Sequence, residues 1–343
     1  MFAVKSSMLV LVALATLSFG AQFPVPSPAT ATNQVLPLSA EQRAEFEAAM
    51  KAKDYTRAET LLVDIINNSN PKSAKLLRLV AGVFFLDKKF LNTIVALRKA
   101  ELLEPLDQPS RFTLAMSFIA LGHSDGAKPE LERLARDHPK VALYPYWLAR
   151  LDYDNQKFLA AVEKLNKAIS LSPEFMKAYD NLGLSLEALG KYDEAIRNYR
   201  EAIRLNRLQK PGSPWPPLNL GILLLKLGKR DEAEACLREA LEYDPGFAEP
   251  HYHLGMLLEK EAKLEDAIKE FTQAATLDLT YPEPEYGLAR VYRRSGDMKN
   301  AKIALREFQK RKREKEARKK KTRQHASGSQ HESATPVPVS AHQ

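Results

Sequence analysis

Residues 176–206 read MKAYDNLGLSLEALGKYDEAIRNYREAIRLN, and this stretch decides the fold. Apolar residues recur at intervals of three and four along residues 178–186, and again along residues 192–203. Such spacing predicts two amphipathic helices, and Gly190 between them marks a break in the helical pattern. The stretch is therefore expected to form a helical hairpin.

The hairpin pattern recurs along the chain with a step of 34 residues. Five Leu-Ala or Leu-Gly pairs follow this step: Leu114-Ala115, Leu148-Ala149, Leu182-Gly183, Leu254-Gly255 and Leu288-Ala289. An alanine follows each pair: Ala127, Ala161, Ala195, Ala267 and Ala301. Leu220-Gly221 continues the series after a four-residue insert within residues 208–214. A repeat of this length indicates a solenoid, and the regular spacing argues against an irregular helical bundle.

Small residues of each unit are expected to let helices approach closely. Gly183 and Ala195 would face one another within a hairpin, while Tyr199 and Ala202 would meet the next unit. A larger side chain at Ala195 would overpack the contact, typically at a cost of about 1–3 kcal/mol.

The residues of one unit that carry the pattern are Tyr179, Leu182-Gly183, Leu186, Tyr192, Ala195, Tyr199 and Ala202. This pattern resembles the tetratricopeptide repeat, although Arg207 stands where that family usually has a closing proline. The resemblance implies an all-α fold, a right-handed α-solenoid of about eight stacked helix-turn-helix hairpins. The units would begin near residues 39, 74, 108, 142, 176, 214, 248 and 282. A basic C-terminal helix would follow.

The first twenty residues have the pattern of a secretory signal peptide. Lys5 precedes an apolar run over residues 8–19, and Ser18 and Gly20 are the small residues expected before a cleavage site. The run is shorter than the roughly 20 residues that span a bilayer. We therefore predict an exported protein that is periplasmic or secreted if the source is bacterial, with its signal peptide cleaved after Gly20. An uncleaved anchor is the alternative.

The rest of the chain divides by composition. Residues 21–38 form a Pro/Ala/Thr-rich linker that we expect to be disordered. Residues 39–312 form the solenoid and residues 313–325 a basic helical extension. Residues 326–343 are poor in large apolar residues and are expected to be a disordered tail.

The positive charge is local. Residues 310–323 contain ten Lys or Arg and two Glu, and this net +8 equals the net charge of the whole chain. The predicted basic patch consists of Lys310, Arg311, Lys312, Arg313, Arg318, Lys319, Lys320 and Lys321. It is either a solvated end helix or a surface for anionic lipid, acidic cell-wall polymer or nucleic acid. Export makes nucleic acid the least favoured partner.

In the resembled family, first helices line a concave groove that binds peptides. Transferring those positions gives the predicted partner-binding residues: Phe112, Tyr146, Trp147, Arg150, Asn181, Asn219, Tyr252 and Arg290. Asn181 and Asn219 occupy the same place in their units, and a carboxamide can donate and accept hydrogen bonds at once. A purely structural or solvated role is the alternative for both. The Lys/Asn clamp that grips a C-terminal carboxylate in some relatives is absent from the equivalent positions.

The sequence offers no catalytic motif. It has no phosphate-binding loop, nucleophile elbow or zinc-type spacing. His251 and His253 are two residues apart on a helix and point to different faces, and Cys236, the single cysteine, is expected to be a small half-buried residue. We predict a protein that is not an enzyme and has no cofactor or metal.

The predicted function is a protein-interaction scaffold that binds a peptide or protein partner in the groove. The alternatives are an envelope tether that uses the basic helix, and an accessory subunit of an envelope enzyme or secretion complex. The insert at residues 208–214 is expected to loosen or kink the stack, and Trp215 beside it to pack against the neighbouring unit or contact a partner. The sequence does not indicate an oligomeric state.

Overall fold

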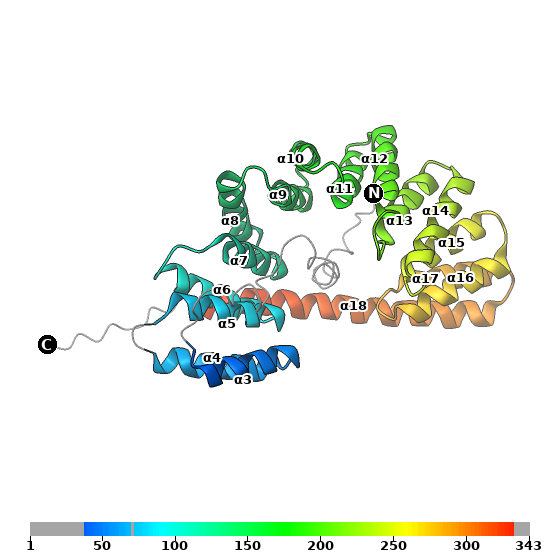
Figure 1. Ribbon diagram of the computed structural model, residues 1–343. Coiled ribbons are helices and arrows are strands. Elements are labelled where there is room, and N and C mark those ends of the chain that lie inside the picture. Colours follow the sequence, from blue (N-terminus) through cyan, green and yellow to red (C-terminus); the bar gives the residue numbers. More distant parts are fainter. Residues whose placement is uncertain (1–37, 70–71, 333–343) are drawn as a thin grey trace. The chain divides into compact units, whose positions relative to one another are not determined.

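The computed structural model describes residues 38–69 and 72–332, and the side chains of Lys319 and of residues 321–332 are not described (Figure 1). The predicted signal peptide, nearly all of the predicted linker and residues 333–343 lie outside the described residues. The chain divides into two compact units, one ending at Leu151 and the other beginning at Asp152. Each is treated separately below.

The described residues form sixteen α-helices and no strand. The helices are α3 (Ala40–Lys51), α4 (Tyr55–Asn68), α5 (Ala74–Leu86), α6 (Phe90–Glu101), α7 (Gln108–Ala120), α8 (Ser124–Asp137), α9 (Leu143–Asp154), α10 (Phe158–Leu171), α11 (Met176–Ala188), α12 (Tyr192–Asn206), α13 (Trp215–Lys226), α14 (Arg230–Tyr243), α15 (Ala248–Lys260), α16 (Leu264–Leu277), α17 (Glu283–Arg294) and α18 (Met298–Glu332). Taken in order, they make the eight predicted helix pairs, so the all-α fold is confirmed.

A residue with positive φ lies between the two helices of every pair. The eight residues are Lys53, Lys88, Gly122, Gln156, Gly190, Gly228, Ala262 and Gly296. Glycine adopts this left-handed conformation freely, whereas an L side chain is strained in it. Half of the hairpin turns therefore have glycine at this position, and the other half have a residue that is strained there.

The N-terminal unit contains the hairpins α3–α4, α5–α6 and α7–α8 packed in sequence. Its first helix begins with a capping box, in which Ser39 accepts from the amide of Gln42 and the Gln42 side chain accepts from the amide of Ser39. Leu62, Leu97 and Leu114 are almost completely buried in one apolar core. Leu114, a member of the recurring Leu-Ala and Leu-Gly pairs, thus lies in this core.

The C-terminal unit contains the hairpins α11–α12, α13–α14, α15–α16 and α17–α18, again packed in sequence. The helices approach closely at glycines. A Cβ at Gly183 would lie 2.5 Å from the ring of Tyr199, which is fully buried. The predicted close approach at Gly183 is confirmed, but Tyr199 reaches it within its own hairpin, where we expected contact with the next unit.

Ion pairs join the second helices of two successive hairpins in the C-terminal unit. Arg200 on α12 pairs with Glu232 on α14 at 2.8 Å. About two helical turns further along both helices, Arg207 pairs with Glu239, also at 2.8 Å. Arg207, the residue at the expected proline position, thus links two neighbouring hairpins.

The insert does not loosen the stack, contrary to one of the two predicted effects, and the kink stays a prediction. The Asn206 side chain, which is fully buried, donates to the Ser213 carbonyl and accepts from the Ser213 amide, both at 2.7 Å. Gly212 packs against the ring of Tyr243. These contacts hold the insert so that α12 and α13 still pack directly.

The last helix, α18, is continuous through both the end of the predicted solenoid and the predicted basic extension. It continues past residue 326, where we placed the start of the disordered tail, and reaches Glu332. Its first part packs on α17 as the second helix of the last hairpin.

Candidate partner-binding surface

The first helices of the C-terminal unit form one continuous surface. Helix α11 contacts α13, α13 contacts α15, and α15 contacts α17. Each second helix reaches the next hairpin mainly through that hairpin's first helix. First helices that approach each other directly make the inner side of a curved stack. We call the surface over α11, α13, α15 and α17 the inner surface.

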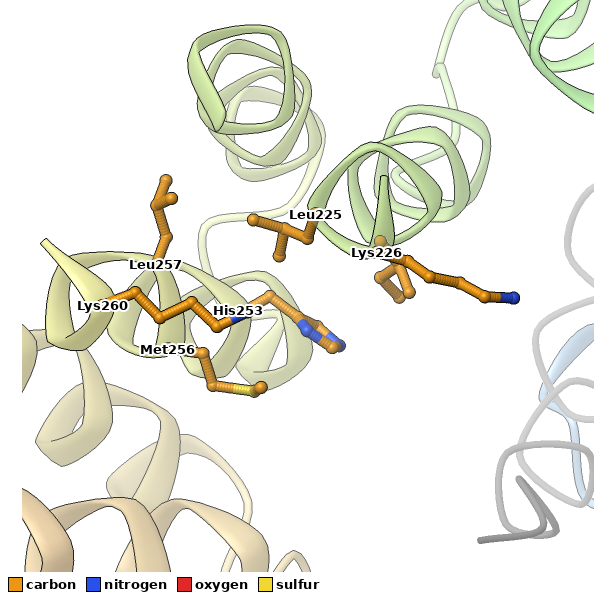
Figure 2. A pocket seen from close by; sticks show the side chains of 7 residues that line it. Leu225, Lys226, His253, Met256, Leu257 and Lys260 are labelled. Atoms are coloured by element: carbon orange, nitrogen blue, oxygen red, sulfur yellow. The ribbon is translucent and has the colours of Figure 1, made fainter. Parts of the chain in front are cut away.

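A pocket of about 190 Å³ opens on the inner surface between α13 and α15 (Figure 2). Its residues recur at helical intervals on the two facing helices, so both helices present them to the same space. They are Ile222, Leu225, Lys226, His253, Met256, Leu257 and Lys260. The lining is apolar, with one imidazole and two lysines. We call it the α13–α15 pocket.

The charges of the pocket come from its lysines. The Nζ atom of Lys226 lies 3.4 Å from Glu187 and 4.7 Å from the centre of the Tyr192 ring. Burial opposes its charge, but Glu187 and Tyr192 raise the pKa of Lys226 above its ordinary value. Lys260 is exposed and has no ion pair among the residues that the structure describes. The Lys226 ammonium is therefore charged at neutral pH.

The imidazole of the pocket is neutral. Burial of the ring lowers the pKa of His253 to about 4. At neutral pH it therefore offers one donor and one acceptor and no charge. The α13–α15 pocket combines apolar side chains, a neutral imidazole and two ammonium groups.

A third cation continues the line of the two lysines. Lys226 and Lys260 each stand five residues after the glycine of their Leu-Gly pair, and Arg294 stands five residues after Ala289. Arg294 donates to the carbonyl of Glu259 at 2.8 Å. All three lie at or near the C-terminus of a first helix, where the helix dipole favours a cation. The sequence prediction missed Lys226 and Lys260, and alignment of the units by their glycines would have found them.

The predicted asparagines make contacts within the fold. Asn181 donates to the carbonyl of Lys177 on its own helix at 2.8 Å. Asn219 on α13 donates to the carboxylate of Asp180 on α11 at 3.0 Å. Asn181 bonds within its own helix, and Asn219 joins two neighbouring first helices. These bonds favour a structural role for both residues.

Tyr252 and Arg290 also join elements of the C-terminal unit. Tyr252 is half-buried in an aromatic cluster, with its ring centre 5.8 Å from that of Phe271 and 5.3 Å from that of Tyr281. Arg290 on α17 forms a bidentate ion pair with Glu259 on α15. Contact of either residue with a partner stays a prediction.

The predicted residues of the N-terminal unit gather on α7 and α9. The rings of Phe112 and Tyr144 are 5.9 Å apart. Tyr146 and Trp147 stack edge to face at 5.6 Å, and the guanidinium of Arg150 lies 5.3 Å from the Trp147 ring centre. Tyr146 and Trp147 are only 3% and 6% exposed, and their contact with a partner stays a prediction.

The predicted basic patch contains one cation that packs inside. Arg311 is partly buried, with its side chain 13% exposed, and it pairs with Glu285 at 2.8 Å and donates to the carbonyl of Ala275. Lys315 beside it pairs with Glu283. Arg311 is therefore not part of a solvated face, because α17 supplies a carboxylate opposite it. The side chains of Lys319 and Lys321 lie outside the described residues.

The remaining expectations concern Trp215, the histidines and membrane segments. Trp215 packs on Phe247, the residue before α15, with ring centres 4.9 Å apart. The ring of His251 forms a hydrogen bond with the carboxylate of Glu270 at 2.7 Å.

Within residues 38–69 and 72–332, no group of three or more His, Cys, Asp or Glu side chains could hold a metal ion. No helix in the described part of the chain has the length and apolar character needed to cross a membrane.

Comparison with known proteins assigns the family. Tetratricopeptide repeat patterns match residues 112–174, 174–245, 218–282 and 286–315, which together make up more than half of the chain. The chain belongs to the tetratricopeptide repeat family.

The relatives support the fold. The TPR repeat-containing protein YpiA of Bacillus subtilis strain 168 is 28% identical over 137 residues, 40% of this chain and 31% of YpiA. The chain thus matches less than a third of that relative. A tetratricopeptide repeat protein from Parabacteroides merdae matches with a TM-score of 0.58 and 16% identity, over 77% of this chain and 98% of its own. PilF from Pseudomonas aeruginosa matches with a TM-score of 0.54 and 20% identity, over 60% and 97%.

Proposed function

We propose that the protein is a non-enzymatic interaction scaffold that binds a segment of a protein partner on its inner surface, in an extracytoplasmic compartment. The α13–α15 pocket is the observation that carries this proposal. Its volume of about 190 Å³ is below the roughly 300–1,000 Å³ of small-molecule sites and suits a single side chain. Membership of a repeat family whose stacked hairpins form binding surfaces supports the same conclusion.

The chemistry of the pocket indicates the partner segment. Leu225 and Met256 supply apolar contacts from two helices, and methionine adapts its shape to different side chains. Lys226 and Lys260 border these contacts with positive charge. We infer that the segment inserts a Leu, Met or Phe side chain and carries an Asp or Glu beside it.

A photo-crosslinking amino acid at Met256 of the full chain, in its native source, tests the proposal. Mass spectrometry should identify a partner that is captured from this position and not from Leu279, an exposed position after α16. Binding of the purified partner is then measured. Leu225→Asp should weaken binding at least about tenfold, because central apolar contacts dominate interface energy.

The matched control for this experiment is Leu279→Asp, which places the same charge away from the inner surface and should leave affinity unchanged. The double variant Lys226→Glu/Lys260→Glu should weaken binding and reduce its dependence on salt. Equal affinity of the wild type, Leu225→Asp and the double variant would refute the inner-surface proposal.

The compartment needs its own test. The support for export is the leader pattern of residues 1–20. Mass spectrometry of the protein from its native source should give an N-terminus at Ala21, in the extracytoplasmic fraction. A chain that keeps Met1 and fractionates with cytosolic markers would refute export and leave the binding surface to be judged separately.

A further inference from the structure

Helix α18 has one face fixed by packing. Ala304 is buried, and Phe308 stacks on Tyr286 with ring centres 5.2 Å apart. Arg311 and Lys315 continue the same face and pair with carboxylates of α17. These contacts set the rotation of the helix about its axis, and therefore determine which residues point away from the unit.

The opposite face carries a row of cations. Its members are exposed and follow one another at helical intervals: Lys299, Lys302, Arg306, Lys310, Arg313 and Lys320. At about 100° per residue all six fall within a quarter of the helix circumference. We call this row the α18 stripe. It begins before the basic patch that the sequence predicted and excludes Arg311 and Lys315.

The charge of the α18 stripe is largely uncompensated. Among the described residues, the stripe's one ion pair joins Lys310 to Glu307 on the same helix at 3.5 Å. Glu316 is the acidic residue that lies closest to the line of the stripe. Packing does not explain these cations, because each is exposed. A row of like charges on one face costs free energy unless an anionic surface faces it.

The shape of the stripe distinguishes between anionic surfaces. From residue 299 to residue 320 the helix extends about 32 Å, at about 1.5 Å per residue. Figure 1 shows α18, coloured orange to red, as one uninterrupted helix. A straight row can touch a flat surface along its whole length. A DNA strand winds once around the duplex axis in about 34 Å. Its phosphates would therefore not stay in line with a straight row of cations of this length.

Apolar side chains border the stripe. Met298 and Leu305 lie along one edge and Ile303 along the other, and all three are at least 40% exposed. Exposed apolar side chains beside cations can enter the boundary between headgroups and acyl chains. We propose that the α18 stripe binds the surface of an anionic lipid bilayer, a role separate from that of the inner surface.

Vesicle co-sedimentation of the full chain tests this proposal. The wild type should bind vesicles of phosphatidylglycerol and phosphatidylcholine in equal parts, and not vesicles of phosphatidylcholine alone. Binding should be lost near 1 M salt, where the screening length is about 3 Å. Leu225→Asp should bind the vesicles as the wild type does.

The decisive variant replaces Lys302, Arg306, Lys310 and Arg313 with Gln. An anionic membrane attracts each nearby cation, and these attractions add. The loss of four cations should therefore weaken partitioning of the protein onto the vesicles on the order of a hundredfold or more. Gln has a helix propensity close to that of Lys and Arg, and circular dichroism will check that α18 is retained.

The matched control removes the same charge elsewhere. It replaces four exposed lysines of the N-terminal unit with Gln: Lys51, Lys75, Lys99 and Lys140. It should bind almost as the wild type does. Equal losses in the two variants would show that net charge alone acts and would overturn the proposal. Binding of a DNA duplex without binding of anionic vesicles would overturn it as well.

Discussion

One aromatic ring sits between two glycines of successive hairpins, and this gives a sharp test of the packing. Phe271 on α16 is fully buried. A Cβ at Gly255 on α15 would lie 2.7 Å from its Cδ1 atom, and a Cβ at Gly287 on α17 would lie 2.7 Å from its Cε1 atom. Carbon atoms prefer about 3.5–4.0 Å, so Gly255→Ala creates an overlap of roughly 1 Å. The ring cannot retreat because Gly287 bounds its other side.

The expected cost of Gly255→Ala follows from two opposing effects. Overpacking costs about 1–3 kcal/mol. Replacing glycine by alanine inside a helix returns about 1 kcal/mol. Gly82 on α5 is the matched control, because a Cβ there meets nothing within 4 Å. Gly82→Ala should stabilise its unit by about 1 kcal/mol. The difference between the two variants then gives the steric cost alone, about 1–3 kcal/mol.

Urea unfolding monitored by tryptophan fluorescence measures both values. The chain has two tryptophans, and each unit contains one, Trp147 or Trp215. Gly255→Ala is measured in a Trp147→Phe background and Gly82→Ala in a Trp215→Phe background. Phe271→Leu should relieve the clash, so that Gly255→Ala costs less in that variant. If Gly255→Ala stabilises as much as Gly82→Ala does, the packing argument is wrong.

Three further predictions concern single residues of the C-terminal unit. Ala262→Gly should raise the free energy of unfolding by about 1 kcal/mol in the same urea assay, because Ala262 has φ of 59°; a lower value would contradict the strain argument. The pKa of His253 is lowered to about 4, so the unfolded chain takes up its proton first as pH falls. Stability should therefore drop between about pH 6.5 and pH 4 by about 1–3 kcal/mol, and less in His253→Gln; NMR titration of the ring with a midpoint near 6.5 would disprove this. Burial raises the pKa of Cys236 to about 11, so its reaction with a disulfide reagent at pH 8 should be at least about a hundredfold slower in the folded chain than in urea.

The hairpins were predictable because their signals are local. The period of apolar residues and the Leu-Gly pairs identified both helices of each unit and the close approach at Gly183. These features depend on residues within one unit, where the helical repeat fixes which side chains face each other. The four-residue insert was also visible, as a shift in the same register.

Contacts between different helices of the stack were much harder to predict. Asn219 reaches Asp180 across 39 residues, and the insert lies between them, so the regular step gave no indication of the pair. Arg311 turned inward because α17 presents Glu285 opposite it. Charge runs in sequence do not show such partners. The repeat pattern therefore predicted the helices that carry these residues but not the side chains that lie opposite them.

The ion pairs of Arg200 with Glu232 and of Arg207 with Glu239 make the hairpins non-equivalent. Deletion of α13 and α14 with their turns would bring the next second helix, α16, into their place. In the register of the repeat, Asp266 would then stand opposite Arg200, but Gln273 would stand opposite Arg207. An array of identical units can lose or duplicate one without changing its interfaces. In this chain the hairpin α11–α12 is matched by charge to its neighbour α13–α14, so the order of these two hairpins is itself encoded in the charges.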